Sequence, residues 1–369
     1  MSDWRPDVPF NELPPPPAAE VLETRVVLKA AIRANAALAQ LDQAVVSIPN
    51  PAVLINAIPL LEAQASSEIE NIVTTTDALF RHQGDEAGAD TATRETLRYR
   101  TALRAGFDQT VERGLTTATA LSVCSTIKGR DMQVRGLPGT RIGNPATGAV
   151  AYSPPEGRDL INQKLGDWER FLHADDGLDS LVRMAAAHYQ FEAIHPFDDG
   201  NGRTGRILNV LLLVESGLLR LPVLYLSRYI IDTKNDYYRL LLAVTAEAAW
   251  EEWVLYMLTG IEVTSRNTLR KIDAIRRLQD DFGRRARAVS RGGADAEFQS
   301  ILFEQPYCRI STVMDRCGVS RPTAASWLNA LAENDMLQTR KVGRDRLFIN
   351  REFLQLLVRQ EPLAERGSG

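Results

Sequence analysis

The 369-residue chain lacks the features that define several classes of protein. Its three cysteines, Cys124, Cys308 and Cys317, are odd in number and far apart, which argues against a disulfide framework and against a cysteine metal site. Its longest apolar stretches, such as Ile207–Val214, are too short to cross a membrane. The first ten residues lack the basic and then apolar pattern of a secretory signal. We therefore expect a soluble, cytoplasmic protein without a membrane partner.

An excess of one charge is also missing, and so are the common nucleotide-binding loops. The formal net charge of −4 gives the whole chain no attraction to nucleic acid. No Gly-x-x-x-x-Gly-Lys-Ser/Thr loop is present. Gly200, Gly202 and Gly205 match the dinucleotide-binding spacing, but the sequence before them predicts a helix instead of a strand. About twenty residues on, apolar Leu221–Leu226 stands where that motif needs an acid, so we reject a dinucleotide site.

Helical periodicity dominates the rest of the chain, so we expect a mainly α fold. A short proline-rich segment, Leu13–Pro17, precedes the first helical pattern. The predicted helices are a segment from Leu54 that could run on to Val73, then Thr91–Arg113, Thr116–Lys128, Arg158–His173, Ser180–Ala193, Arg206–Glu215, Tyr237–Ala248 and Trp253–Arg277.

Two regions depart from this pattern. The stretch Val134–Gly157 is rich in glycine and proline, and Ala149–Ser153 could form a strand, which together predict a small β-hairpin flap. From about Phe298, a helix–turn–helix pattern with its second helix at Pro322–Glu333 is followed by two short predicted strands. This is the order of a winged helix.

The segment from His195 to Arg206 carries the strongest chemical signal. Pro196 disfavours helix at His195, so the imidazole should lie at the mouth of a loop, where it can accept a proton near neutral pH. Gly200 and Gly202 allow positive φ and leave backbone N–H groups open, and a helix follows. With Arg203 and Arg206 these groups form a phosphate site. Asp199 supplies an oxygen ligand for Mg²⁺, so the parts of phosphoryl or nucleotidyl transfer lie within twelve residues.

This segment resembles the signature of Fic-domain proteins, His-Pro-Phe-x-Asp/Glu-Gly-Asn-Gly-Arg-x-x-Arg, at every fixed position. Residues Ser66–Asn71 resemble the family's inhibitory pattern Ser/Thr-x-x-x-Glu-Gly/Asn, placed ahead of the catalytic core. The resemblance covers roughly residues 50–260, and the winged-helix tail resembles that of larger bacterial members. It implies an N-terminal segment at 1–49, a Fic catalytic bundle at 50–285 with an inhibitory helix at about 54–73, and a winged helix at 296–369.

The resemblance implies an enzyme that transfers AMP from ATP to a Tyr, Ser or Thr hydroxyl of a protein or of itself, releasing pyrophosphate. His195 would be the catalytic base, Asp199 would hold Mg²⁺, and Phe197 would anchor the loop in the core. The flap at about Val150–Pro155 would hold the target backbone by strand addition. The residues that would bind ATP are Glu70, Asp199, Gly200, Asn201, Gly202, Arg203, Thr204, Gly205, Arg206, Tyr237 and Tyr238. Some relatives carry Asn where this chain has Thr245, so no contact is predicted there.

Glu70 and Ser66 are four residues apart, so on a helix they would share one face. The family pattern implies that Glu70 pairs with Arg206 and inhibits catalysis. His188 is expected to be a buried structural residue, and Tyr237 and Tyr238 have core packing as their competing role.

Three alternatives stay open. The winged helix could belong to a DNA-binding regulator with a Fic-like sensor, but Pro322–Glu333 contains no Arg or Lys, so nucleic acid is not the expected partner. The enzyme could instead mainly remove AMP. The tail could also serve a homodimer.

Overall fold

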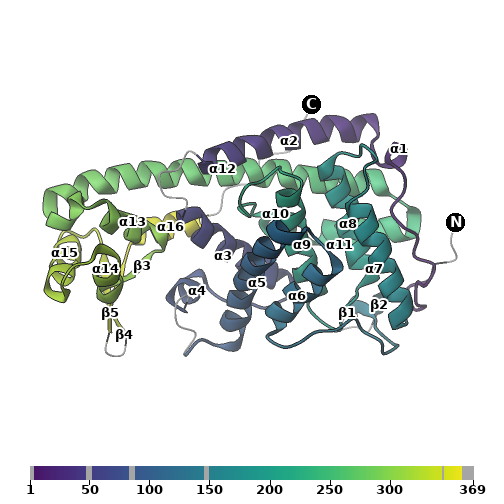
Figure 1. Ribbon diagram of the computed structural model, residues 1–369, viewed down its shortest axis with the longest axis horizontal. Coiled ribbons are helices and arrows are strands. Elements are labelled where there is room, and N and C mark those ends of the chain that lie inside the picture. The colour runs from purple at the N-terminus through teal and green to yellow at the C-terminus, as the bar shows by residue number, and fades with distance from the viewer. Residues whose placement is uncertain (1–3, 47–51, 83–87, 145–148, 343–344, 360–369) are drawn as a thin grey trace.

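The computed structural model describes residues 4–46, 52–82, 88–144, 149–342 and 345–359, and these ranges are mainly helical, as expected (Figure 1). The larger part of the molecule contains a bundle of helices. They are α1 (Ala19–Leu22), α2 (Arg25–Val46), α3 (Ala52–Ile69), α4 (Thr76–His82), α5 (Thr91–Arg113), α6 (Thr117–Lys128), α7 (Arg158–Leu172), α8 (Ser180–Ile194), α9 (Asn201–Glu215), α10 (Leu226–Asp232) and α11 (Lys234–Glu247).

Helix α12 (Trp250–Val289) is 40 residues long and runs along most of the length of the molecule in Figure 1, with α2 above its right half. It extends beyond Arg277, where the sequence pattern ended, and past residue 285, the expected limit of the catalytic domain. Helix α2 packs along it, and α8, α10 and α11 contact it as well. The segment before residue 50 is therefore part of the helical body.

The C-terminal part begins with a short 3₁₀ turn, Arg291–Ala294, and contains four helices and a small sheet. Its helices are α13 (Ala296–Glu304), α14 (Ile310–Cys317), α15 (Arg321–Glu333) and α16 (Arg351–Val358). Its strands are β3 (Tyr307–Arg309), β4 (Gln338–Val342) and β5 (Asp345–Ile349), which pair antiparallel in the order β3-β5-β4. The order agrees with the expected winged helix, and Ser320 caps α15 through the Thr323 N–H. The connection between β4 and β5, Gly343 and Arg344, lies outside the described residues.

The expected flap contains β1 (Ile142–Asn144) and β2 (Ala149–Tyr152), paired antiparallel. Their connection, 145–148, lies outside the described residues. The N-terminal segment supports the flap from behind, because the Phe10 N–H donates to the Ser153 carbonyl at 2.9 Å.

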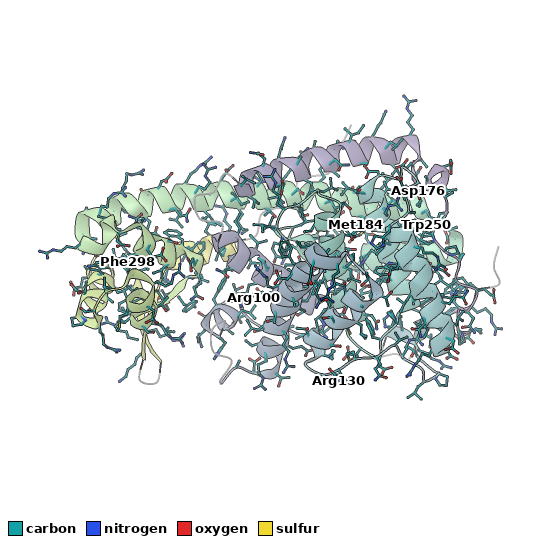
Figure 2. All side chains as sticks on the ribbon, in the orientation of Figure 1. Arg100, Arg130, Asp176, Met184, Trp250 and Phe298 are labelled. Carbon is teal, nitrogen blue, oxygen red and sulfur yellow. The ribbon has the colours of Figure 1, made fainter. Side chains whose placement is uncertain are left out.

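Two hydrophobic cores hold the molecule together, one in the large bundle and one in the C-terminal part. Met184 lies in the first and Phe298 in the second (Figure 2). Helix α3 contributes to both, because Leu54 and Ile58 pack in the first core and Leu60 and Leu61 in the second. The helix that carries Ser66 is therefore fixed between the two parts.

Helix α3 ends at Ile69 and not at Val73, because Asn71 adopts a left-handed conformation with φ 62°. Glu70 is thus the first residue after the helix, in a turn in which its N–H donates to the Ser67 carbonyl at 3.0 Å. The expectation that Ser66 and Glu70 lie on one continuous helix is therefore wrong: Ser66 lies in α3, and Glu70 lies in the turn after it.

Phe197 occupies the core as expected, 1% exposed and 6.3 Å from the Phe191 ring. We predict that Phe197→Ala lowers the free energy of unfolding by about 3–5 kcal/mol, because it leaves a cavity under the loop. Urea denaturation measures this loss. Val111→Ala, at a position that is 66% exposed, is the control and should change stability by less than about 0.5 kcal/mol. Equal losses in the two variants would contradict the anchoring role.

Candidate active site

His195 is the residue at which α8 ends. It adopts the left-handed conformation, with φ 48° and ψ 61°, and its N–H donates to the Phe191 carbonyl at 3.0 Å. A residue with a Cβ is uncommon in this region of backbone space and needs support from its surroundings. His195 therefore stands at the start of the loop, just after the helix, as Pro196 predicted.

Arg135 supplies that support and was missed by the sequence reasoning. Its side chain donates to the carbonyls of His195 at 2.7 Å, Ile194 at 3.2 Å and Pro155 at 2.5 Å, and its N–H donates to Pro196 at 2.9 Å. A guanidinium at the C-terminal end of a helix donates to the unpaired carbonyls there and interacts favourably with the negative end of the helix dipole. Arg135 thus ties the flap to the base. The only signal in the sequence was its place in a Gly- and Pro-rich stretch that also contains Arg141.

The charge state of His195 follows from this environment. Burial and the Arg135 charge lower the pKa of His195 to about 4, although the Glu192 backbone, Glu70 and Asp199 act in the opposite direction. The imidazole is therefore neutral at physiological pH, which is the state that a proton acceptor needs.

The loop after His195 closes on itself through Asn201. Its side chain accepts from the Phe197 N–H at 2.8 Å and donates to the Phe197 carbonyl at 2.7 Å. Both the oxygen and the nitrogen of this amide thus bond within the loop, so the Asn201 side chain shapes the loop. Gly200 has a positive φ of 86°, a conformation that glycine was expected to allow at this position.

Helix α9 starts at Asn201 and not at Arg206, so most of the expected phosphate loop is the first turn of a helix. Its N-terminal N–H groups and positive dipole end still form an anion site, as expected. Gly202 does not have positive φ. A Cβ at Gly202 would lie 2.3 Å from Glu70 Oε1, so a larger residue there would displace the Glu70 carboxylate. Glu70 therefore lies directly over the start of α9.

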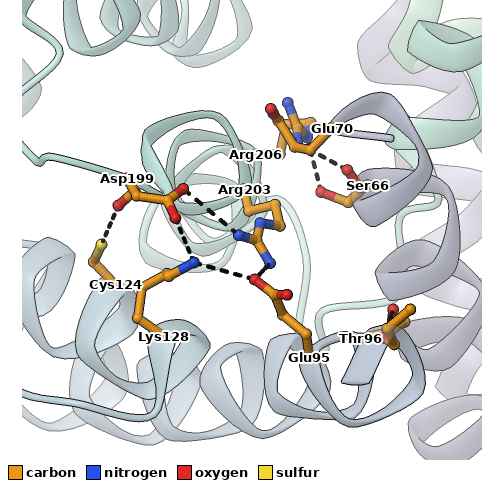
Figure 3. A network of polar contacts seen from close by, with 10 residues as sticks. Ser66, Glu70, Glu95, Thr96, Cys124, Lys128, Asp199, Arg203 and Arg206 are labelled. Carbon is orange, nitrogen blue, oxygen red and sulfur yellow. Dashed lines mark hydrogen bonds and ion pairs between the residues drawn. The ribbon is translucent and has the colours of Figure 1, made fainter. Parts of the chain in front are cut away.

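Arg206 is held by the end of α3 and the turn after it through three hydrogen bonds, which we call the α3 clasp. Its Nε donates to Ser66 Oγ at 2.8 Å, and its Nη2 donates to the Ser66 carbonyl and to Glu70 Oε1, each at 2.9 Å (Figure 3). Arg206 is 2% exposed, whereas the Glu70 side chain is 36% exposed. Burial alone would raise the pKa of Glu70, but the charges of Arg206 and Arg203 lower it, so Glu70 is a carboxylate.

Asp199 lies on the other side of this helix end, with its side chain 57% exposed. It pairs with Lys128, and Arg203 Nη2 lies 4.0 Å from its Oδ1. Burial acts against ionisation, but Lys128 and Arg203 lower the pKa of Asp199. One accessible carboxylate beside a phosphate site fits a magnesium ion that shares its ligands with a nucleotide. The described residues contain no cluster of three metal-ligating side chains that would hold a metal alone.

The remaining predicted ATP residues lie at different depths. Thr204 and Gly205 are buried, and a Cβ at Gly205 would lie 2.5 Å from Glu192 Oε1 on α8. Tyr237 is 1% exposed and shares a 2.8 Å hydrogen bond with His188 Nε2, whereas Tyr238 is 44% exposed. His188 is thus buried and partnered, as expected. The contacts of these residues with ATP stay predictions, and Tyr238 is the most accessible of them.

Comparison with known protein families gives three matches along the chain. Residues 28–108 match the N-terminal model of the Fic/DOC family, and residues 124–213 match the Fic/DOC family itself. Residues 294–353 match the C-terminal domain of SoFic-like protein adenylyltransferases. The chain belongs to the Fic/DOC family.

Curated relatives of this Fic protein match it over short regions. Protein adenylyltransferase fic-1 of Caenorhabditis briggsae is 34% identical over 91 residues, which are 24% of this chain and 17% of that protein. A probable protein adenylyltransferase of Aquifex aeolicus is 38% identical over 81 residues, which are 21% of this chain and 24% of that protein. The matched regions thus span less than a quarter of these relatives.

Solved structures share the fold. A Fic family protein from Desulfovibrio desulfuricans has a TM-score of 0.55 and 20% identity, over 91% of this chain and 98% of that one. Fic-1 from Caenorhabditis elegans has a TM-score of 0.51 and 19% identity, over 66% and 73%. No helix in the described part of this Fic protein is long and apolar enough to span a membrane.

The lowered pKa of His195 can be tested directly. We predict that an NMR titration shows its ring neutral from pH 8 down to about pH 5, where an unperturbed histidine would already be mostly protonated. Arg135→Met should raise the pKa by removing a positive charge, and Arg135→Lys should leave it low. Titration of the wild-type ring near pH 6.5 would refute this assignment.

Proposed function

We propose that this Fic protein transfers the AMP group of ATP to a Tyr, Ser or Thr hydroxyl of a protein, including itself, and releases pyrophosphate. The observation that carries the proposal is the convergence of a neutral His195, the Asp199 carboxylate and the cationic start of α9 at one loop. The match to a SoFic-like adenylyltransferase domain and the names of the curated relatives support the same reaction.

In this reaction His195 takes the proton of the target hydroxyl. The hydroxyl oxygen bonds to the α-phosphorus, and the bond from that phosphorus to the bridging oxygen of pyrophosphate breaks. Because the pKa of His195 is lowered, its ring is already neutral at physiological pH and can accept this proton without first losing one. Arg135 and Asn201 hold the loop in place, so the base is preorganised before the substrate arrives.

The start of α9 would bind the triphosphate. The backbone N–H groups at Gly200–Gly202 lie at the positive end of the α9 dipole, and Arg203 and Arg206 would add charge for the β- and γ-phosphates. Asp199 would hold Mg²⁺, which when bound neutralises charge on the α- and β-phosphates. Tyr238, exposed on α11, is the accessible candidate for the adenosine side.

The flap would hold the target. The β2 edge from Val150 to Tyr152, with Ser153–Pro155 following, would add a strand of the target protein. Arg135 joins Pro155 to the His195 backbone, so a hydroxyl held by the flap would lie in fixed relation to the base. A cytoplasmic location and a homodimer remain proposals.

The α3 clasp would inhibit this reaction. While Glu70 is paired with Arg206, that arginine is not available to bind the γ-phosphate. The Glu70 carboxylate also lies over the phosphate site. ATP could still bind along Gly200–Arg203, but with its α-phosphorus misaligned. A displacement of about 1 Å can cost on the order of 10²-fold in rate. If AMP removal also occurs, Glu70 would activate the water.

We predict that His195→Ala abolishes transfer of label from α-labelled ATP while nucleotide affinity changes little, because the phosphate site belongs to α9. Labelling and calorimetric nucleotide binding are measured on the same preparation. Near wild-type labelling in His195→Ala would eliminate His195 as the base.

We predict that Glu70→Gly increases self-labelling by about tenfold or more, because Arg206 is released. Glu68→Gly is the matched control, since Glu68 lies two residues earlier at the end of the same helix and makes no contact in the clasp. It should label like the wild type, and Glu70→Gly with His195→Ala should not label at all. Equal labelling of Glu70→Gly and Glu68→Gly would dismiss the inhibitory role.

A further inference from the structure

Lys128 and Cys124 lie one turn apart on α6 and support the Asp199–Gly200 turn from below. Cys124 Sγ lies 3.4 Å from the Asp199 carbonyl. A Cβ at Gly200 would lie 3.4 Å from Lys128 Cδ, so the aliphatic part of the lysine packs beneath this glycine. Lys128 is therefore positioned by packing as well as by charge.

The Lys128 ammonium lies between two carboxylates. Its Nζ is 2.5 Å from Asp199 Oδ2 and 3.2 Å from Glu95 Oε1, and the lysine is only 16% exposed (Figure 3). Glu95, on α5, also forms an ion pair with Arg203, whose Nη1 lies 2.8 Å from Glu95 Oε1. Asp199, Lys128, Glu95 and Arg203 thus form one alternating chain of charges across the floor of the site.

This arrangement places a cation on the oxygen that a metal would use. A divalent ion at Asp199 meets an ammonium already bound to Oδ2, and like charges at such a separation repel. The ion must therefore share or displace Lys128. Glu95 gives the displaced lysine a second anion within reach, so the exchange does not leave a buried charge without a partner.

We propose that Lys128 is a resident counter-cation that holds Asp199 while no metal is present, and that its displacement sets the metal concentration at which the site fills. The proposal rests on the proposed function, because it takes Asp199 to be the metal ligand. It adds a control on metal occupancy that is separate from the α3 clasp.

The test measures Mn²⁺ binding by the loss of its free electron paramagnetic resonance signal. The full chain, in excess over an ATP analogue with a methylene between the α- and β-phosphorus so that no transfer occurs, is titrated with Mn²⁺. The analogue without protein gives the reference, because it binds Mn²⁺ on its own. Lys128→Met should tighten Mn²⁺ binding by about two- to fivefold, the change that corresponds to a partly exposed ion pair. Lys128→Arg should bind Mn²⁺ like the wild type.

Two further variants separate a specific effect from a general one. Arg130→Met removes the same charge two residues away, at the exposed surface below α6, and should leave Mn²⁺ binding unchanged (Figure 2). In an Asp199→Asn background, which should itself weaken binding, Lys128→Met should no longer tighten it.

The outcomes distinguish this proposal from the proposed function. If wild type and Lys128→Met bind Mn²⁺ equally, or if Arg130→Met tightens binding as much, the role of Lys128 is overturned and the metal role of Asp199 stands. If Asp199→Asn binds Mn²⁺ as tightly as the wild type, both are overturned. Tighter binding in Lys128→Met alone, lost in the Asp199→Asn background, supports both.

Discussion

A buried arginine that must always have an anion organises this molecule. Arg206 is 2% exposed. A buried charge without a partner costs several kcal/mol, which is comparable to the whole free energy of unfolding of a domain. In this conformation α3 supplies the partner through Ser66 and Glu70. In the proposed reaction a phosphate takes that place. Arg206 cannot pair fully with both Glu70 and a phosphate at the same time. Binding of the nucleotide is therefore coupled to the position of α3.

The two sides of the site differ in how firmly they are held. His195 is held by Arg135, and its loop by the Asn201 bonds to Phe197; Arg135, Asn201 and Phe197 are all buried. Glu70 stands in the turn after α3, next to a left-handed Asn71, with its side chain partly exposed. The base is thus built into the core, whereas the inhibitory carboxylate is at a helix end that can change without disturbing it. Since α3 also packs in the C-terminal core through Leu60 and Leu61, that part of the chain contacts the inhibitory helix directly.

Local pattern predicted the helices and the motif well, because amphipathic periodicity and the glycine and proline positions act within a few residues. Helix α5 was predicted to the residue, and the loop at His195 followed from Pro196. The ends of helices were less predictable. Helix α3 stops at Ile69, and α9 starts at Asn201 because the amide of that residue closes the loop. Arg135, Glu95 and Lys128 could not be found from sequence, since their importance lies in contacts with segments far along the chain.

The central claim is that the group transferred is AMP, and the most direct measurement follows the two ends of ATP separately. The Glu70→Gly variant is incubated with Mg²⁺ and ATP labelled either at the α- or at the γ-phosphorus, and the label retained by the protein is counted after denaturation. Our account predicts that the α label stays on the protein and the γ label leaves in pyrophosphate. Retention of the γ label, or loss of the α label, would contradict it.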